Sequence, residues 1–160
     1  MAADMFIKVG DIKGESTDHK HKDEIEIHSW SWGVMQPGSM GSGGGGGAGK
    51  ASFNELTFTH SMDKASPNLL TICATGDHVD KAVLTVRKAG KEQQEYLVIT
   101  MDTVFVTAVQ DGGSDGGGIP TESVNLQFAK VDLEYKPQKK DGSLEAGVHF
   151  KYDIKENKTF

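Results

Sequence analysis

The sequence predicts a mainly β protein, an antiparallel two-sheet β-barrel with one short helix at its side. Most of the chain consists of short segments in which apolar and polar residues alternate with the period of two typical of a half-buried strand. Only the stretch 66–76 carries the start and stop signals of a helix. Two strand segments change the phase of their alternation, within 24–32 and near 129–130. Such a change indicates a bulge that bends the sheet, or a strand that is buried on both faces.

Length and composition favour a single domain over 1–160. The hydrophobic content of 36% is low for a globule that folds alone. The formal net charge of −6 argues against a nucleic-acid backbone or an anionic membrane as the main partner. The single cysteine, Cys73, excludes an intrachain disulfide and a metal site made of several cysteines.

No targeting or membrane segment is visible in the sequence. The first residues lack the charged region and apolar region of a Sec signal. No stretch approaches the roughly eighteen consecutive apolar residues that a membrane helix needs. We therefore expect a protein that is made in the cytoplasm and inserts into no membrane.

The first strand is predicted at 5–9, where Met5, Ile7 and Val9 alternate with Phe6 and Lys8. The polar stretch 14–24 that follows is predicted to be a surface loop. It contains His19 and His21, but no third ligand follows at a recognisable spacing, so the pair favours a solvated loop over a zinc site.

The next strand segment presents small hydroxyls on one parity. Ile25 and Ile27 share that parity with Ser29 and Ser31, whereas Trp30 and Trp32 point to the opposite side. A plain solvent face would more often carry Lys or Glu. A lumen or a subunit seam would suit such a face, and an ordinary Ser/Thr-rich exposed sheet is the alternative.

A glycine-rich loop at about 36–51 resembles a nucleotide site in part, because Gly44–Lys50 matches G-x-x-x-x-G-K. The match fails at the next position, where Ala51 stands in place of the Ser or Thr that binds Mg²⁺. The segment 52–59 favours a strand, whereas a P-loop must open a helix. Since five consecutive glycines are costly to order, we expect a protein-contact loop.

The helix is predicted to begin at Ser66, a favourable N-cap, with Pro67 in its first turn. An apolar stripe at helical spacing follows, and Gly76 can end the helix. Cys73 lies in this stripe and is predicted to be a buried thiol rather than a nucleophile.

The rest of the chain predicts further strands. Ala82, Leu84 and Val86 form one, and 96–109 is long enough to require a corner or two strands, divided near Asp102. A second glycine loop at 111–118 lacks the spacing of a calcium loop. The apolar parity at 124–128 reverses at 131–135, and residues 148–154 show the cleanest alternation in the chain. The uncharged companion positions in the earlier half are Ser123, Asn125 and Gln127.

Several motifs in order resemble the haemolysin-coregulated protein (Hcp) family, and the resemblance covers essentially the whole chain. The matching segments are 4–11, 14–16, Trp30-Ser31-Trp32-Gly33, 43–50, 63–69, 87–90, 95–97 and 131–138. Each motif alone is modest, whereas the ordered set is specific.

This resemblance implies a ring-forming, phage tail-tube-like subunit of the type VI secretion system. Six-membered rings would stack into a hollow tube inside a contractile sheath. The tube would be expelled with the spike protein and would carry small effector proteins in its lumen. Family members of this type are exported without a cleaved signal, which would place the chain outside the cell after secretion.

These expectations lead to specific site residues. The lumen and effector candidates are Ser29, Ser31, Ser123 and Asn125. The ring-stacking candidates are Gly38, Ser39, Met40, Gly43, Gly47, Gly49 and Lys50. We expect no catalytic residue, cofactor or metal, and the alternative is a small enzyme or nucleotide-binding protein that uses the glycine loop and Lys50.

Overall fold

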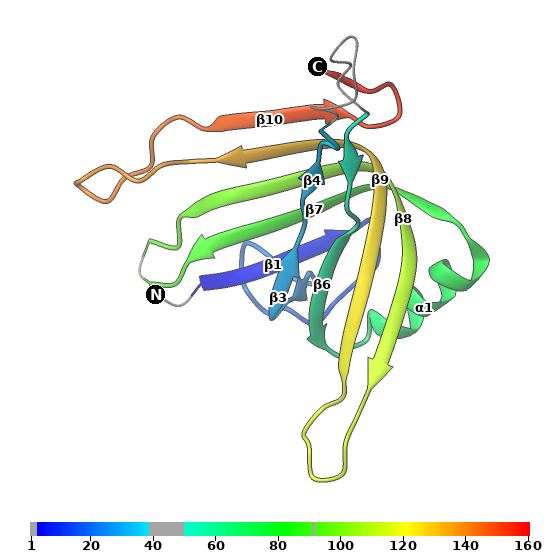
Figure 1. Cartoon of the computed structure of the whole chain (residues 1–160). Helices are drawn as coiled ribbons and strands as arrows, with labels where there is room; N and C mark the ends of the chain where they lie inside the picture. Colours follow the sequence, from blue (N-terminus) through cyan, green and yellow to red (C-terminus); the bar gives the residue numbers. More distant parts are fainter. Residues whose placement is uncertain (1–2, 39–49, 91) are drawn as a thin grey trace.

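The computed structural model describes residues 3–38, 50–90 and 92–160, which form strands and one helix (Figure 1). The elements are β1 (Ala3–Val9), β2 (Ile25–Glu26), β3 (Ser29–Ser31), β4 (Val34–Met35), β5 (Ser52–Phe53), β6 (Leu56–Ser61), α1 (Ser66–Thr75), β7 (His78–Lys88), β8 (Glu95–Gly112), β9 (Thr121–Tyr135), β10 (Val148–Asp153) and β11 (Lys158–Thr159). The predicted mainly β class with a short side helix is confirmed.

The main sheet is antiparallel throughout and runs in the order β11-β10-β9-β8-β7-β1-β2. Strand β6 pairs with β9 and carries β3 on its other side, and β4 pairs with β5 in a separate hairpin. The pairing does not close into a continuous barrel, because β2 pairs with β1 whereas β3 pairs with β6. The backbone between these strands still connects the two parts: Ile27 N–H donates to Met5 O and His28 N–H donates to Thr59 O.

The long β8–β9 hairpin bends sharply and belongs to both halves of the fold (Figure 1). In β8 the buried parity changes from Ile99 and Met101 to Val104 and Val106, with Thr103 between them at a φ of 53°. That backbone conformation is rare for a β-branched residue. The corner predicted near Asp102 is therefore confirmed, although the strand remains continuous. Because the phase changes, Phe105 lies on the face opposite Ile99 and is exposed.

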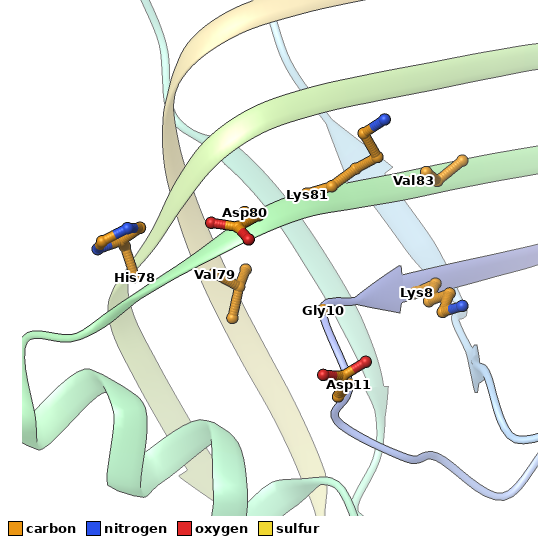
Figure 2. Close-up of a pocket in the computed structure, with 8 residues that line it drawn as sticks. All are labelled: Lys8, Gly10, Asp11, His78, Val79, Asp80, Lys81 and Val83. Carbon is orange, nitrogen blue, oxygen red and sulfur yellow. The ribbon is translucent and has the colours of Figure 1, made fainter.

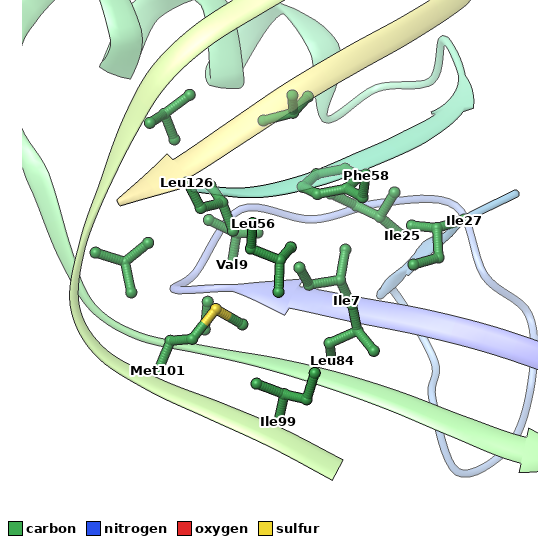
Figure 3. Packing of buried hydrophobic residues seen from close by; sticks show 14 of the residues in the cluster. Ile7, Val9, Ile25, Ile27, Leu56, Phe58, Leu84, Ile99, Met101 and Leu126 are labelled. Carbon is green, nitrogen blue, oxygen red and sulfur yellow. The ribbon is translucent and has the colours of Figure 1, made fainter. Parts of the chain in front are cut away.

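The core lies between these two halves of the bent sheet (Figure 3). On one side, apolar residues of β1, β7 and β8 align in rows, such as Ile7, Leu84 and Ile99. On the other side, Leu56 and Phe58 of β6 lie opposite Leu126 and Val124 of β9. All of these side chains are fully buried, which is the outcome that the period-two patterns predict.

Helix α1 ends where the sequence predicts, but its cap differs. Gly76 adopts a left-handed conformation (φ 74°) and its N–H donates to Ile72 O. At the start, Ala65 is the N-cap residue and no described side chain caps the helix, while Asp63 Oδ1 accepts from Ala65 N–H at 2.9 Å just before the first turn. The assignment of Ser66 as N-cap was wrong, because Ser66 is the first helical residue and its Oγ accepts from Asp63 N–H. Cys73 is half-buried rather than buried. No helix among the described residues could span a membrane.

The polar segment 14–24 is only partly a solvated loop, because two buried ionic groups attach it to the sheet. His21 stacks on Phe6 with ring centres 4.5 Å apart, and its Nε2 lies 2.8 Å from Glu95 Oε1. Arg87, 2% exposed, forms a two-point ion pair with Asp18 and lies over the same Phe6 ring. The prediction that His21 is solvated was wrong, because the distant Phe6 and Glu95 join the nearby Glu24 in covering and binding its ring.

Replacing Arg87 by Met should lower the free energy of unfolding at pH 7 by about 2 kcal/mol, since Asp18 keeps some solvent contact. The Arg87 guanidinium holds the pKa of Asp18 well below its ordinary value of 3.8. A lowered carboxyl pKa stabilises the fold above the unfolded value, and this contribution disappears as the pH falls through the folded value. The difference between wild type and Arg87→Met in urea unfolding should therefore shrink towards pH 3 and below. Lys81→Met, exposed on the same strand, should show no such loss.

Candidate functional site

The four lumen candidates lie on one face of one part of the sheet. Strand β6 lies between β3 and β9, so that Ser29 lies opposite Thr59, which lies opposite Ser123. In the next row, Ser31 lies opposite Thr57, which lies opposite Asn125. We call this surface the hydroxyl face. It consists of Ser29, Ser31, Thr57, Thr59, Ser123 and Asn125.

Hydrogen bonds between strands keep these small side chains in place. Ser29 Oγ and Thr59 Oγ1 are 2.6 Å apart, and Thr57 donates to Asn125 Oδ1 at 3.0 Å. Ser29 and Ser31 are exposed, whereas the other members are half-buried. Hydroxyls that bond to one another across strands leave a low, even surface, which keeps hydrogen-bonding capacity for a partner.

The hydroxyl face carries no charge, and its uncharged character continues onto β8. Its two rows reach Gln110 and Ala108 of that strand. The alternate residues of β6 and β9, such as Phe58 and Val124, point into the core and are fully buried. The orientation of the face is therefore determined by the core, since a shift by one residue would expose these apolar side chains.

The expected ring-stacking loop begins and ends at a real hairpin. Val34 pairs with Phe53 and Met35 pairs with Ser52, so β4 and β5 flank the connection 36–51. Gly38 and Lys50 are exposed. The remaining stacking candidates, Ser39, Met40, Gly43, Gly47 and Gly49, lie outside the described residues. Lys50 leads into strand β5 rather than into a helix, so the phosphate-binding arrangement of a P-loop is not favoured.

An aromatic cluster supports the root of this hairpin. The Trp32 ring lies 6.1 Å from Phe53, 5.9 Å from Phe128 and 6.2 Å from Phe150, and Tyr152 packs against Phe53 and Phe150. Sequence analysis places Trp32 opposite the serines but does not indicate which distant strands supply its partners.

A different surface depression of about 500 Å³ lies at the junction of β1 and β7 (Figure 2). Its lining mixes lysines with carboxylates, among them Lys8, Asp11, Asp80 and Lys81. Gly10 allows the backbone at the end of β1 to approach Val79 of β7 closely, because a Cβ at this position would lie 2.9 Å from the Val79 side chain. The mixed charges favour no single ligand class.

The described side chains do not assemble a recognisable catalytic site. The nearest arrangement is His28, whose Nε2 lies 2.9 Å from Ser61 Oγ. A nucleophile and base of this type also need a group that orients the imidazole, and none contacts His28 among the described residues. The same part of the chain offers no group of three metal-binding side chains.

Comparison with known proteins decides the family. Residues 6–135 match the family model described as "Type VI secretion system effector, Hcp". The chain belongs to the Hcp family. It is 52% identical over 159 residues to the protein hcp1 of Pseudomonas aeruginosa, and the match covers 98% of both chains.

Solved structures of Hcp proteins share the fold. Hcp1 from Salmonella typhimurium has a TM-score of 0.82 with 41% identity, covering all of both chains. A type VI secretion system effector from Yersinia pestis has a TM-score of 0.78 with 37% identity, covering 94% of this chain and 99% of its own. A structure described as a type six secretion system protein has a TM-score of 0.93 with 30% identity, covering 99% and 100%.

Proposed function

We propose that this Hcp-family chain is the tube subunit of a type VI secretion system, and that its hydroxyl face lines the lumen of a six-membered ring. Family membership supports the role. The observation that carries the assembly is an apolar surface on the main sheet that the chain itself covers only in part.

This surface extends the cross-strand rows of core residues past the edge of the buried core. Leu133 lies opposite the buried Ile99, and the row reaches Phe150 of β10. In the outermost row, Tyr135 lies opposite Leu97 and Val148. The exposed fractions are 37% for Phe150, 48% for Tyr135 and 65% for Val148. We call Tyr135, Val148 and Phe150 the apolar flank.

A second copy of the chain is the partner that best fits this flank. Contiguous exposed apolar side chains mark protein interfaces, and these three continue directly from the core. The sheet that carries the hydroxyl face also has two different free edges among the described residues. Strand β3 pairs only with β6, and residues 108–112 of β8 pair only with β9. Two unlike edges favour a head-to-tail contact, which closes into a ring when the rotation between neighbouring subunits returns to the first one.

In the proposed tube, the β4–β5 hairpin makes the contacts between stacked rings. This hairpin carries the connection 36–51, which contains Gly38 and Lys50. The exposed Val34 and Met35 at its root add apolar contact area. In this proposal the spike protein, the contractile sheath and small effector proteins are the further partners. The chain has no catalytic role and leaves the cell through the secretion machine without a Sec signal.

Native mass spectrometry tests the assembly directly. We expect a particle of six times the 17.2 kDa chain mass, and negative-stain images that show rings with a central hole. The rings should survive dilution to micromolar concentration, because each subunit shares two seams. A single-chain mass at micromolar concentration would contradict the proposal.

A further inference from the structure

An ionisable cluster with a buried centre connects three strands at the end of the sheet next to helix α1. His60 of β6 lies opposite Glu122 of β9, which lies opposite Asp111 of β8. The exposed fractions of His60 and Glu122 are 0% and 1%, and His60 Nε2 lies 2.8 Å from Glu122 Oε1. Burial of such a pair is costly unless its remaining polar atoms also find partners.

The turn before helix α1 completes the cluster. Asp63 Oδ2 is 3.9 Å from His60 Nδ1, too far for a hydrogen bond, and the other oxygen of Asp63 accepts from the N–H of Ala65, the residue before the helix. The same turn reaches the β8–β9 hairpin, because Met62 N–H donates to Pro120 O. The cluster therefore lies where three elements meet: the helix start, strand β6 and the base of the hairpin tip.

Within the described residues this cluster is under-satisfied. His60 Nδ1 and Glu122 Oε2 are buried and have no hydrogen-bond partner. A single imidazole faces three carboxylates, Glu122, Asp111 and Asp63. A fourth carboxylate, Glu15, accepts from Lys64 N–H beside the same turn. Ser66 is the buried hydroxyl nearby. This balance favours retention of protons on the buried Glu122 and on Asp63 over full ionisation.

We propose that His60, Glu122, Asp111 and Asp63 form a proton-operated latch. With a proton on the cluster, the start of α1 is held against the base of the β8–β9 hairpin, and loss of that proton loosens both. Solvent can reach the cluster, since a depression of about 470 Å³ is lined by Asp111, Thr121 and Glu122.

The direction of the pH dependence follows from the individual groups. Burial, with Asp111 beside it, raises the pKa of Glu122 to about 7. Burial also raises the pKa of Asp63 and lowers that of His60. A raised carboxyl pKa stabilises the fold below the unfolded value, and this contribution is lost as the pH rises through the folded value. The lowered pKa of His60 opposes this stabilisation only below pH 6.5, the ordinary pKa of histidine. The latch should thus loosen between about pH 6.5 and pH 8.

Hydrogen exchange measured by mass spectrometry on the intact assembled protein tests the latch. After correction for the intrinsic rates, protection of peptides covering 62–70 and 112–121 should fall by up to about tenfold between pH 6 and pH 8.5. Glu122→Gln imitates the protonated carboxyl and should remove most of this loss. Glu145→Gln, at an exposed carboxyl, should behave as wild type. Parallel loss of protection in wild type and Glu122→Gln would overturn the proposal.

A second variant keeps the test decisive if Glu122→Gln does not fold. Asp111→Asn removes an exposed carboxylate that faces Glu122, and its amide can donate to the ionised form. The midpoint of the loss of protection should therefore move to lower pH by about one unit. An unchanged midpoint would show that the cluster does not control the opening.

Discussion

Val148→Asp should convert the ring into single chains. Val148 is 65% exposed in the isolated chain, so an aspartate at this position should change the free energy of unfolding of that chain only slightly. In a seam the same carboxylate would be buried without a partner, which costs about 3–5 kcal/mol. That energy corresponds to a loss of about 10²-fold or more in affinity at every seam of the ring. Native mass spectrometry and size-exclusion chromatography at micromolar concentration measure the result.

Matched variants separate a seam effect from a folding effect. Val148→Thr keeps the β-branched shape without a charge and should retain most of the rings. Lys151→Asp introduces an aspartate on the opposite face of the same strand and should leave assembly intact. Circular dichroism should show the same strand content in all three variants. If Val148→Asp still forms rings of unchanged mass, the apolar flank is not the seam.

Ser31→Gln should lower the recovery of co-expressed effectors about tenfold or more while leaving the rings intact. Ser31 is exposed at the edge of the hydroxyl face, opposite Thr57. A longer amide would rise above the low surface made by the neighbouring hydroxyls. Because six copies line one lumen in the proposed ring, an effector that touches several copies would lose several contacts at once. Affinity capture of an effector followed by quantitative mass spectrometry measures the recovery.

The outcome of Ser31→Gln distinguishes the roles open to this residue. Ser114→Gln, an exposed serine in the hairpin tip, should leave effector recovery unchanged. Rings that fall apart in Ser31→Gln would place Ser31 in a seam. Intact rings with full effector recovery would leave the hydroxyl face without a docking role.

Local patterns in the sequence were sufficient for the fold class and for its bends. Alternation with period two predicted the strands, and the Pro67 and Gly76 signals predicted the helix. The length of 96–109 predicted the corner that the structure shows at Thr103, and the phase change near Ala129 corresponds to a change of buried parity in β9. These features depend on residues close in sequence, since backbone sterics and side-chain direction act over a few positions.

The four lumen candidates came from the same local reasoning, because an uncharged parity is visible within one strand. Their assembly into one face was not visible, since Ser29 and Ser123 meet only through Thr59 of β6. Strand order and register depend on how the whole core packs. The sequence could therefore predict the chemistry of each strand face but not which faces join.

Buried polar residues show most clearly the difference between what the sequence predicts and what only the packed fold decides. By itself, the sequence determined a bent, mainly β subunit of the Hcp type with a short capped helix and uncharged strand faces. Only the tertiary structure decided that His21, His60, Arg87 and Glu122 are buried. The physical reason is that burial of a charged group depends on a partner distant in the chain: Arg87 needs Asp18, and His60 needs Glu122. The helical or strand periodicity of a sequence contains no information about such long-range pairs.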